Sequence, residues 1–71
     1  ATLVAQRHLD STRARIRHGE SIQSGVDEES GFRVARTVDN GDPDFIRLGV
    51  TVYPVGGNRR LVEIIALVER P

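Results

Sequence analysis

The first eighteen residues carry an apolar stripe with the period of an α-helix. Apolar or small side chains recur at spacings of four and three, which places them on one helical face. The stripe consists of Ala1, Ala5, Leu9, Thr12 and Ile16, with Val4 and His8 on its flanks. Gly19 suits the left-handed position that commonly ends a helix, and Arg17 and His18 complement the negative end of the helix dipole. The pattern predicts a helix over residues 1–18.

The start of this helix is less well marked than its end. No Ser, Thr, Asp or Asn precedes Ala1, and the first turn holds no proline or acidic residue. We therefore expect residues 1–18 to be the C-terminal part of a longer helix that continues upstream. The stripe is also thin, because Ala1, Ala5 and Thr12 permit close approach to another surface. An isolated helix of this length is marginal in water, so we expect it to pack on the rest of the chain and on partner helices.

Three later segments alternate between apolar and polar residues with the period of β-strands. We expect strands at about residues 31–38, 45–53 and 60–69. In the first segment, Arg36 interrupts an otherwise apolar face. In the third, both faces are largely apolar, which is typical of a strand that is covered on both sides.

Turn-forming residues separate these segments. Residues 19–30 are rich in Ser, Gly and acids and are predicted to be a loop, although part of them could pair as a fourth strand. The connections at residues 39–44 and 54–59 carry Gly, Asn and Pro and are short. Short connections force neighbouring strands to run antiparallel. The sequence thus predicts an α+β fold in which residues 1–71 form a single domain, with one N-terminal helix packed on three or four antiparallel strands.

Length and composition limit how this domain can be stabilised. A chain of 71 residues has a small core, which seldom supplies more than about 3–5 kcal/mol without a disulfide, a metal or a partner. The chain has no cysteine, which excludes disulfides and cysteine-based zinc sites. Partner proteins are therefore the expected source of further stability, and we expect no cofactor.

Two acidic clusters are the first candidates for a chemical site. Asp39, Asp42 and Asp44 share one loop, and several carboxylates in a loop can chelate calcium. Their spacing does not match an EF-hand, so the favoured interpretation is an acidic turn in solvent. The three consecutive acids at 27–29 diverge in direction and have no apolar surroundings, which favours a solvated charge run over an acid–base set.

His8 has Asp10 and Ser11 close by in sequence, as a catalytic triad would need. Ser11 could reach His8 from the next helical turn, but Asp10 points to a different face and cannot orient the imidazole. His8 is therefore interpreted as a partly buried or interfacial histidine. We predict no catalytic residue and no enzymatic activity.

The arginines of the helix raise an alternative of a different class, a nucleic-acid-binding module. Arg13 and Arg17 share a helical face, whereas Arg15 points elsewhere. The chain has only three aromatic residues, so it offers no platform for stacking bases. Ten arginines balance ten acidic residues, and a chain with zero net charge gains little from counterion release. A solvated or partner-facing surface is the favoured interpretation, and binding in gel shifts at low salt would decide the matter.

Three short segments carry a resemblance to a known family. Residues 1–11, with Ala5-Gln6 and then Leu9, look like the stretch where a pilin helix leaves the membrane. Residues 30–34 resemble the first strand after a variable loop, and residues 48–64 resemble a closing hairpin. In this order the segments resemble the type IV pilin superfamily, and within it the minor pseudopilins of type II secretion, of the general secretion pathway protein I class.

The resemblance implies a structural subunit that supports protein export across the outer membrane. Such proteins have a leader that a prepilin peptidase removes, a methylated N-terminal residue and an apolar segment that anchors them in the inner membrane. The soluble domain lies in the periplasm of a Gram-negative bacterium. Minor members of this class form a pseudopilus tip complex with the minor pseudopilins of the J and K classes, next to the major pseudopilin.

The resemblance also implies assembly through the N-terminal helix. The residues expected at helix–helix contacts are Ala1, Val4, Ala5, His8, Leu9, Thr12 and Ile16. Leu9→Arg is accordingly expected to weaken binding to partner pseudopilins. A minor pilin of a type IV pilus or competence system is the alternative within the superfamily.

Overall fold

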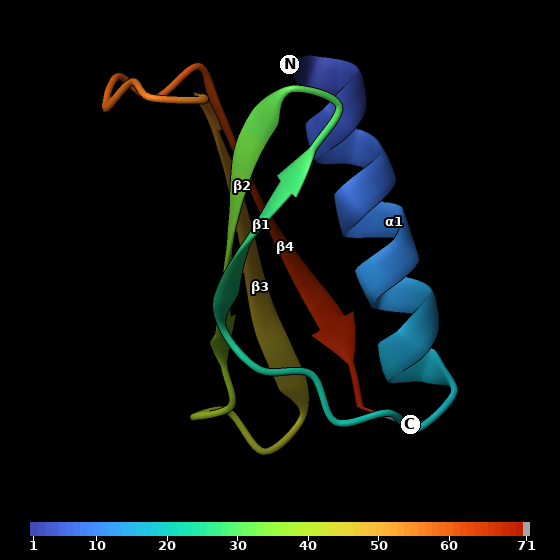
Figure 1. Cartoon of the computed structure of the whole chain (residues 1–71). Helices are drawn as coiled ribbons and strands as arrows, with labels where there is room; N and C mark the ends of the chain where they lie inside the picture. The colour runs from blue at the N-terminus through green and yellow to red at the C-terminus, as the bar shows by residue number, and fades with distance from the viewer. Residues whose placement is uncertain (71) are drawn as a thin grey trace.

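One helix and four antiparallel strands make up the computed structural model, which describes residues 1–70 (Figure 1). The elements are α1 (Thr2–Arg17), β1 (Gly25–Glu29), β2 (Phe32–Asp39), β3 (Phe45–Pro54) and β4 (Val62–Glu69). The strands form one sheet in the order β1-β2-β3-β4, each antiparallel to the next. This is the predicted α+β class, with a helix packed on an antiparallel sheet.

The end of α1 follows the predicted signal. Gly19 has a φ of 85°, in the left-handed region that glycine adopts without strain. Its N–H donates to the carbonyl of Ile16, and the N–H of Glu20 donates to the carbonyl of Arg15, both at 3.0 Å. This pair of bonds satisfies carbonyls that the helix end would otherwise leave open. In the described part of the chain, no helix is both long and apolar enough to cross a membrane.

β1 lies inside the segment that was predicted to be a loop, residues 19–30. The possibility that part of this segment pairs as a fourth strand is confirmed. β1 and β2 are joined by the two-residue turn Ser30-Gly31, in which both φ angles are positive, at 51° and 80°. Such turns match the twist of paired strands. The three predicted strands agree with β2, β3 and β4 to within two residues at each end.

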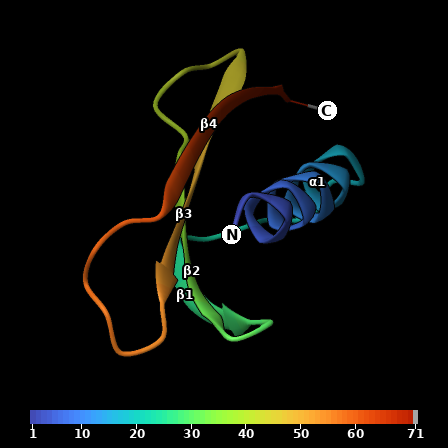
Figure 2. The same cartoon turned by 90° about the horizontal axis from the view of Figure 1, so that it is seen from above.

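The core lies between α1 and one face of the sheet. α1 crosses β3 and β4 on this inner face, as the view from above shows (Figure 2). Alternation along the strands sends every second side chain toward α1. Four of these have no exposed surface: Val34, Leu48, Val50 and Val52. Burial of each such aliphatic side chain favours folding by about 1.5–3 kcal/mol.

The outer face of the sheet has no helix over it within residues 1–70 (Figure 2). Arg33 stacks its guanidinium 4.8 Å from the ring centre of Tyr53 on this face. Ile65 and Leu67 of β4 are 53% and 64% exposed. The prediction that this strand is covered on both sides is therefore wrong for the described chain: α1 covers one side and nothing in residues 1–70 covers the other.

Candidate functional site

Most of the helix residues predicted to contact partner helices pack instead on the chain's own sheet. The buried members of the set are Val4, Ala5, Leu9, Thr12 and Ile16. They pack there because burial of the apolar inner face of the sheet against an apolar helix face removes both from water. Only Ala1 is exposed, while His8 is partly buried at the edge of the helix. Leu9→Arg would place a charge in the core, so this variant tests folding and cannot report on a partner.

The small residues of the stripe set how closely α1 approaches the sheet. Ala5 has no exposed surface, and Thr12 is 2% exposed. The hydroxyl of Thr12 donates to the backbone carbonyl of His8 at 2.8 Å, so its burial leaves no unpaired hydroxyl. The close approach that these residues allow is therefore used inside the domain.

A polar cluster lies where α1, β1 and β2 meet, around Arg36. This side chain starts from the inner face of β2 and is only 15% exposed. Its Nε donates to the carbonyl of Gln23 at 2.8 Å, and its Nη1 lies 3.2 Å from Oδ2 of Asp27. The same Nη1 lies 3.3 Å from Nε2 of His8. Arg36 thus connects the helix, the segment after it and two strands.

These contacts define the state of the His8 ring. A guanidinium can only donate, so a hydrogen bond across this distance requires Nε2 of His8 to accept, with the ring proton on Nδ1. Nδ1 lies 3.5 Å from Oε2 of Glu29, so its N–H faces that carboxylate. Oε2 is nevertheless buried without a hydrogen bond among the described residues, so this contact is a loose one. The ring is held from both sides.

The cluster is suited to holding the fold and not to acid–base catalysis. In a histidine–carboxylate pair that acts as a base, the nitrogen remote from the carboxylate faces the substrate. Here that nitrogen of His8 faces Arg36 at 3.3 Å. The cluster was not predicted from the sequence, although one signal was present. A charged residue on the inner face of a strand, here Arg36, needs partners nearby, and the acids at 27–29 supply one.

The acidic loop between β2 and β3 forms turns. Oδ1 of Asp39 accepts from the N–H of Gly41 at 2.9 Å, and Oδ1 of Asp42 accepts from the N–H of Asp44 at 2.7 Å. Both contacts are Asx turns, in which the carboxylate stabilises the local backbone. Within residues 1–70, no three acids or histidines approach closely enough to hold a metal ion. The interpretation as a turn fits this geometry.

The helix arginines lie in three different surroundings. Nη2 of Arg7 donates to Oγ of Ser30 at 3.4 Å, and Arg15 pairs with Glu20 at 3.5 Å. Arg13 and Arg17 line one groove beside the end of β4. The prediction that these last two share a face is confirmed. No single face of the described helix gathers all four arginines.

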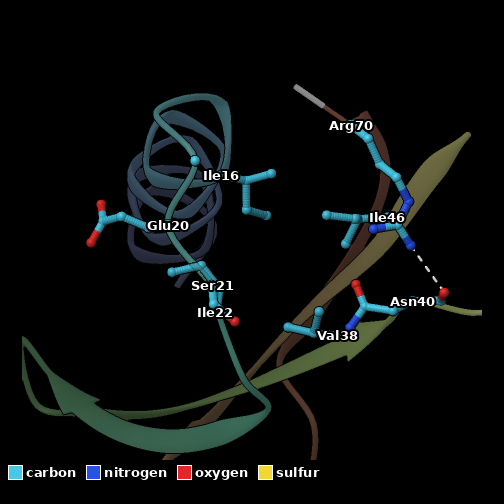
Figure 3. Close-up of a pocket in the computed structure, with 9 residues that line it drawn as sticks. Ile16, Glu20, Ser21, Ile22, Val38, Asn40, Ile46 and Arg70 are labelled. Atoms are coloured by element: carbon cyan, nitrogen blue, oxygen red, sulfur yellow. Dashed lines mark hydrogen bonds between the residues drawn. The ribbon is translucent and has the colours of Figure 1, made fainter.

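A second hollow lies at the C-terminal end of α1 and has a volume of about 200 Å³. Ile16, Ile22, Val38 and Ile46 form its apolar part (Figure 3). Arg70 closes one side, where its guanidinium donates to the carbonyls of Asn40 and Asp42 at 3.0 Å. This hollow brings together aliphatic side chains and a guanidinium that is already bonded to backbone. It adds to the packing at the end of the core and presents no reactive pair.

Comparisons with protein-family models, with curated proteins and with solved structures found no match to this chain.

Proposed function

We propose that this chain is the soluble part of a structural subunit of the type IV pilin superfamily, a minor pseudopilin of a type II secretion system. The observation that carries the proposal is the arrangement of the elements: an N-terminal helix packs lengthwise on one face of an antiparallel sheet (Figure 1). The resemblance of residues 1–11, 30–34 and 48–64 to pseudopilin segments implies this order of elements.

The packing of α1 limits which of its residues can contact a partner. Because the stripe from Val4 to Ile16 is occupied by the sheet, partner helices would contact the exposed side of α1. Leu3 is 68% exposed and lies in the first turn of the helix. Contact with a neighbouring subunit would remove this apolar side chain from water, which favours association. Leu3 therefore replaces Leu9 as the residue to vary.

The test is co-purification of the full-length protein with the other pseudopilins encoded in the same genome. We expect Leu3→Arg to reduce recovery of the J-class and K-class partners at least tenfold. Ala14→Arg is the matched control, because Ala14 is exposed near the other end of α1. Equal recovery with both variants would reject this role for the helix end.

The gene itself supplies a second test that needs no partner. The reading frame upstream of the Ala1 codon should encode a leader ending in Gly, followed by Phe or Met and an apolar run with a Glu near its start. An upstream sequence without these features would reject the superfamily. If they are present beside pilus or competence genes, the chain is a minor pilin of that system instead.

A further inference from the structure

The two edges of the sheet carry opposite charge on the side that faces α1. On β1, Asp27 pairs with Val34 and Glu29 pairs with Phe32, so both acids share the inner face. On the other edge, Arg13 and Arg17 of α1 line a groove of about 400 Å³ beside residues 67–70. β1 and β4 are the two outermost strands of the sheet, so these edges lie at its two ends (Figure 2). The inner face of one edge therefore carries two acids, which Arg36 and His8 contact within the chain. The groove at the other edge is lined by Arg13 and Arg17 together with Glu69 and Arg70.

The same two edges both expose apolar side chains on the outer face. Val26 pairs with Ala35 and is 62% exposed. On β4, Ile65 and Leu67 are exposed by more than half of their surface. Both edges thus combine exposed apolar side chains on the outer face, next to Glu28 on β1 and to Glu63 and Glu69 on β4, with charged groups on the inner face.

The β4 edge also has unmet hydrogen-bonding capacity. Its strand pairs only with β3, so alternate backbone N–H and C=O groups point away from the sheet. The N–H of Arg70 donates to the carbonyl of Asp44 across the β3–β4 pair, which by alternation leaves Leu67 with its N–H on the open side. Within the described chain, Nε of Arg13 is buried without a partner. No ion pair of the described residues involves Arg13 or Arg17.

We propose that the β4 edge binds the β1 edge of a second copy of this chain, so that the two sheets join head to tail. In a meander of four strands, β1 and β4 run in opposite directions. A copy translated across the sheet therefore places its β1 antiparallel to β4, with both helices on the same side. Four strands at about 4.8 Å give a repeat of roughly 19 Å, which leaves room for helices of about 10–12 Å in diameter.

Charge selects the register of this contact. With Val26 opposite Leu67, Glu28 lies opposite Ile65, and the outer faces join without facing like charges. A shift of two residues along β4 would set Glu28 against Glu63, which is unfavourable. In the favoured register Asp27 enters the inner face next to the groove of Arg13 and Arg17. Oppositely charged pairs at this position also steer the two copies together.

A symmetric β4–β4 contact fits these features less well. It would bring two basic grooves onto one side of the joined sheet with no acidic strand between them. The β1–β4 contact instead pairs each basic groove with an acidic edge and leaves a free edge of each kind at the two ends. A contact of this kind does not close on itself and adds copies one after another. Because β1 has only five residues, we expect weak association, on the order of 100 µM.

The experiment blocks one edge at a time with proline. The two-residue turn after β1 makes Glu29 and Phe32 a hydrogen-bonded pair, so by alternation the N–H of Val26 points away from β2. Val26→Pro and Leu67→Pro therefore remove N–H groups that make no bond within the chain, a place where edge strands tolerate proline. Asparagine at the same two positions provides a second pair of variants without the ring. Leu3→Asn removes an exposed apolar side chain of α1, which belongs to neither edge strand, and serves as the control.

Sedimentation velocity and ¹⁵N chemical-shift titrations would follow self-association. We expect the wild type and Leu3→Asn to associate progressively, with shifts at residues 25–29 and 63–69 together. Each edge variant alone should associate at least tenfold more weakly. An equimolar mixture of Val26→Pro and Leu67→Pro should form a heterodimer and nothing larger, because one intact edge of each kind remains.

Four results would overturn the proposal. Continued dimerisation of Val26→Pro alone would assign the contact to two β4 edges. No association of the wild type at about 1 mM, or a mixture no more associated than its components, would remove the second copy as the occupant. If the wild type did not self-associate but bound a synthetic peptide with an acidic strand sequence, the partner of the β4 edge would be another protein. None of these results bears on the proposed pseudopilin function, which rests on α1.

Discussion

Replacement of Arg36 by methionine tests whether the polar cluster holds the helix, β1 and β2 together. Methionine keeps an unbranched stem in the same space while removing all the hydrogen bonds of the guanidinium. The bond to the carbonyl of Gln23 is charge-assisted and is worth about 1.5 kcal/mol. The contact with Asp27 adds little, because the Asp27 side chain is 56% exposed and the pair is screened by solvent. We expect Arg36→Met to lower the free energy of unfolding by about 2 kcal/mol.

This loss is large for a domain of this size. The core of a chain of 71 residues supplies only about 3–5 kcal/mol. A loss of about 2 kcal/mol lowers the melting temperature by roughly 8–16 °C. Urea unfolding followed by far-UV circular dichroism measures the free energy directly. Amide hydrogen exchange should show the largest loss of protection at residues 25–29, since β1 depends on this cluster for its link to α1.

A matched control separates the cluster from a simple loss of charge. Arg47 lies exposed on the outer face of β3, and Arg47→Met should change stability by less than about 0.5 kcal/mol. Asp27→Asn should cost about as little, because its ion pair is exposed. If Arg36→Met were no more destabilising than Arg47→Met, the cluster would contribute nothing net and this account of β1 would be refuted.

Three further substitutions test the packing. Ala5→Leu should destabilise the domain by about 1–3 kcal/mol in urea unfolding, because Ala5 has no exposed surface and a larger side chain forces α1 off the sheet. Leu48→Ala should cost about 2–5 kcal/mol, which leaves much of the protein unfolded, as the dispersion of its amide NMR spectrum would show. Gly31→Ala should cost about 1–2 kcal/mol by the same unfolding assay, because residue 31 has a φ of 80°.

Local patterns were sufficient to predict the helix and three of the strands. The stripe from Ala5 to Ile16 has a strong period, and Gly19 marks the end of α1 with a specific backbone conformation. The alternation in β3 is equally clear, because its inner residues are all aliphatic. These signals lie within one element each. These patterns can therefore be recognised in the sequence without knowledge of what each element packs against.

β1 and its contacts could not be predicted in the same way. Three of its five residues are acids, which have low β-propensity and suggest a solvated loop. The strand is held by pairing with β2 and by contacts from Arg36 and His8, which are distant in sequence. The dependence on contacts distant in sequence also explains why buried helix residues were predicted to form a partner surface. The period of the stripe shows that Leu9 and Ile16 are buried by something, and only the fold shows that it is the chain's own sheet.

The zero net charge of the chain conceals a separation of charge in space. Three acids lie on β1, while Arg13 and Arg17 lie at the opposite edge of the sheet, beside β4 and its Glu69. Charged groups at an exposed contact are screened within about 8 Å at physiological ionic strength. Contact between sheet edges should therefore weaken as salt is added, whereas apolar contact through Leu3 should not. The two proposed surfaces, one along the helix and one across the sheet, can then act independently in one protein.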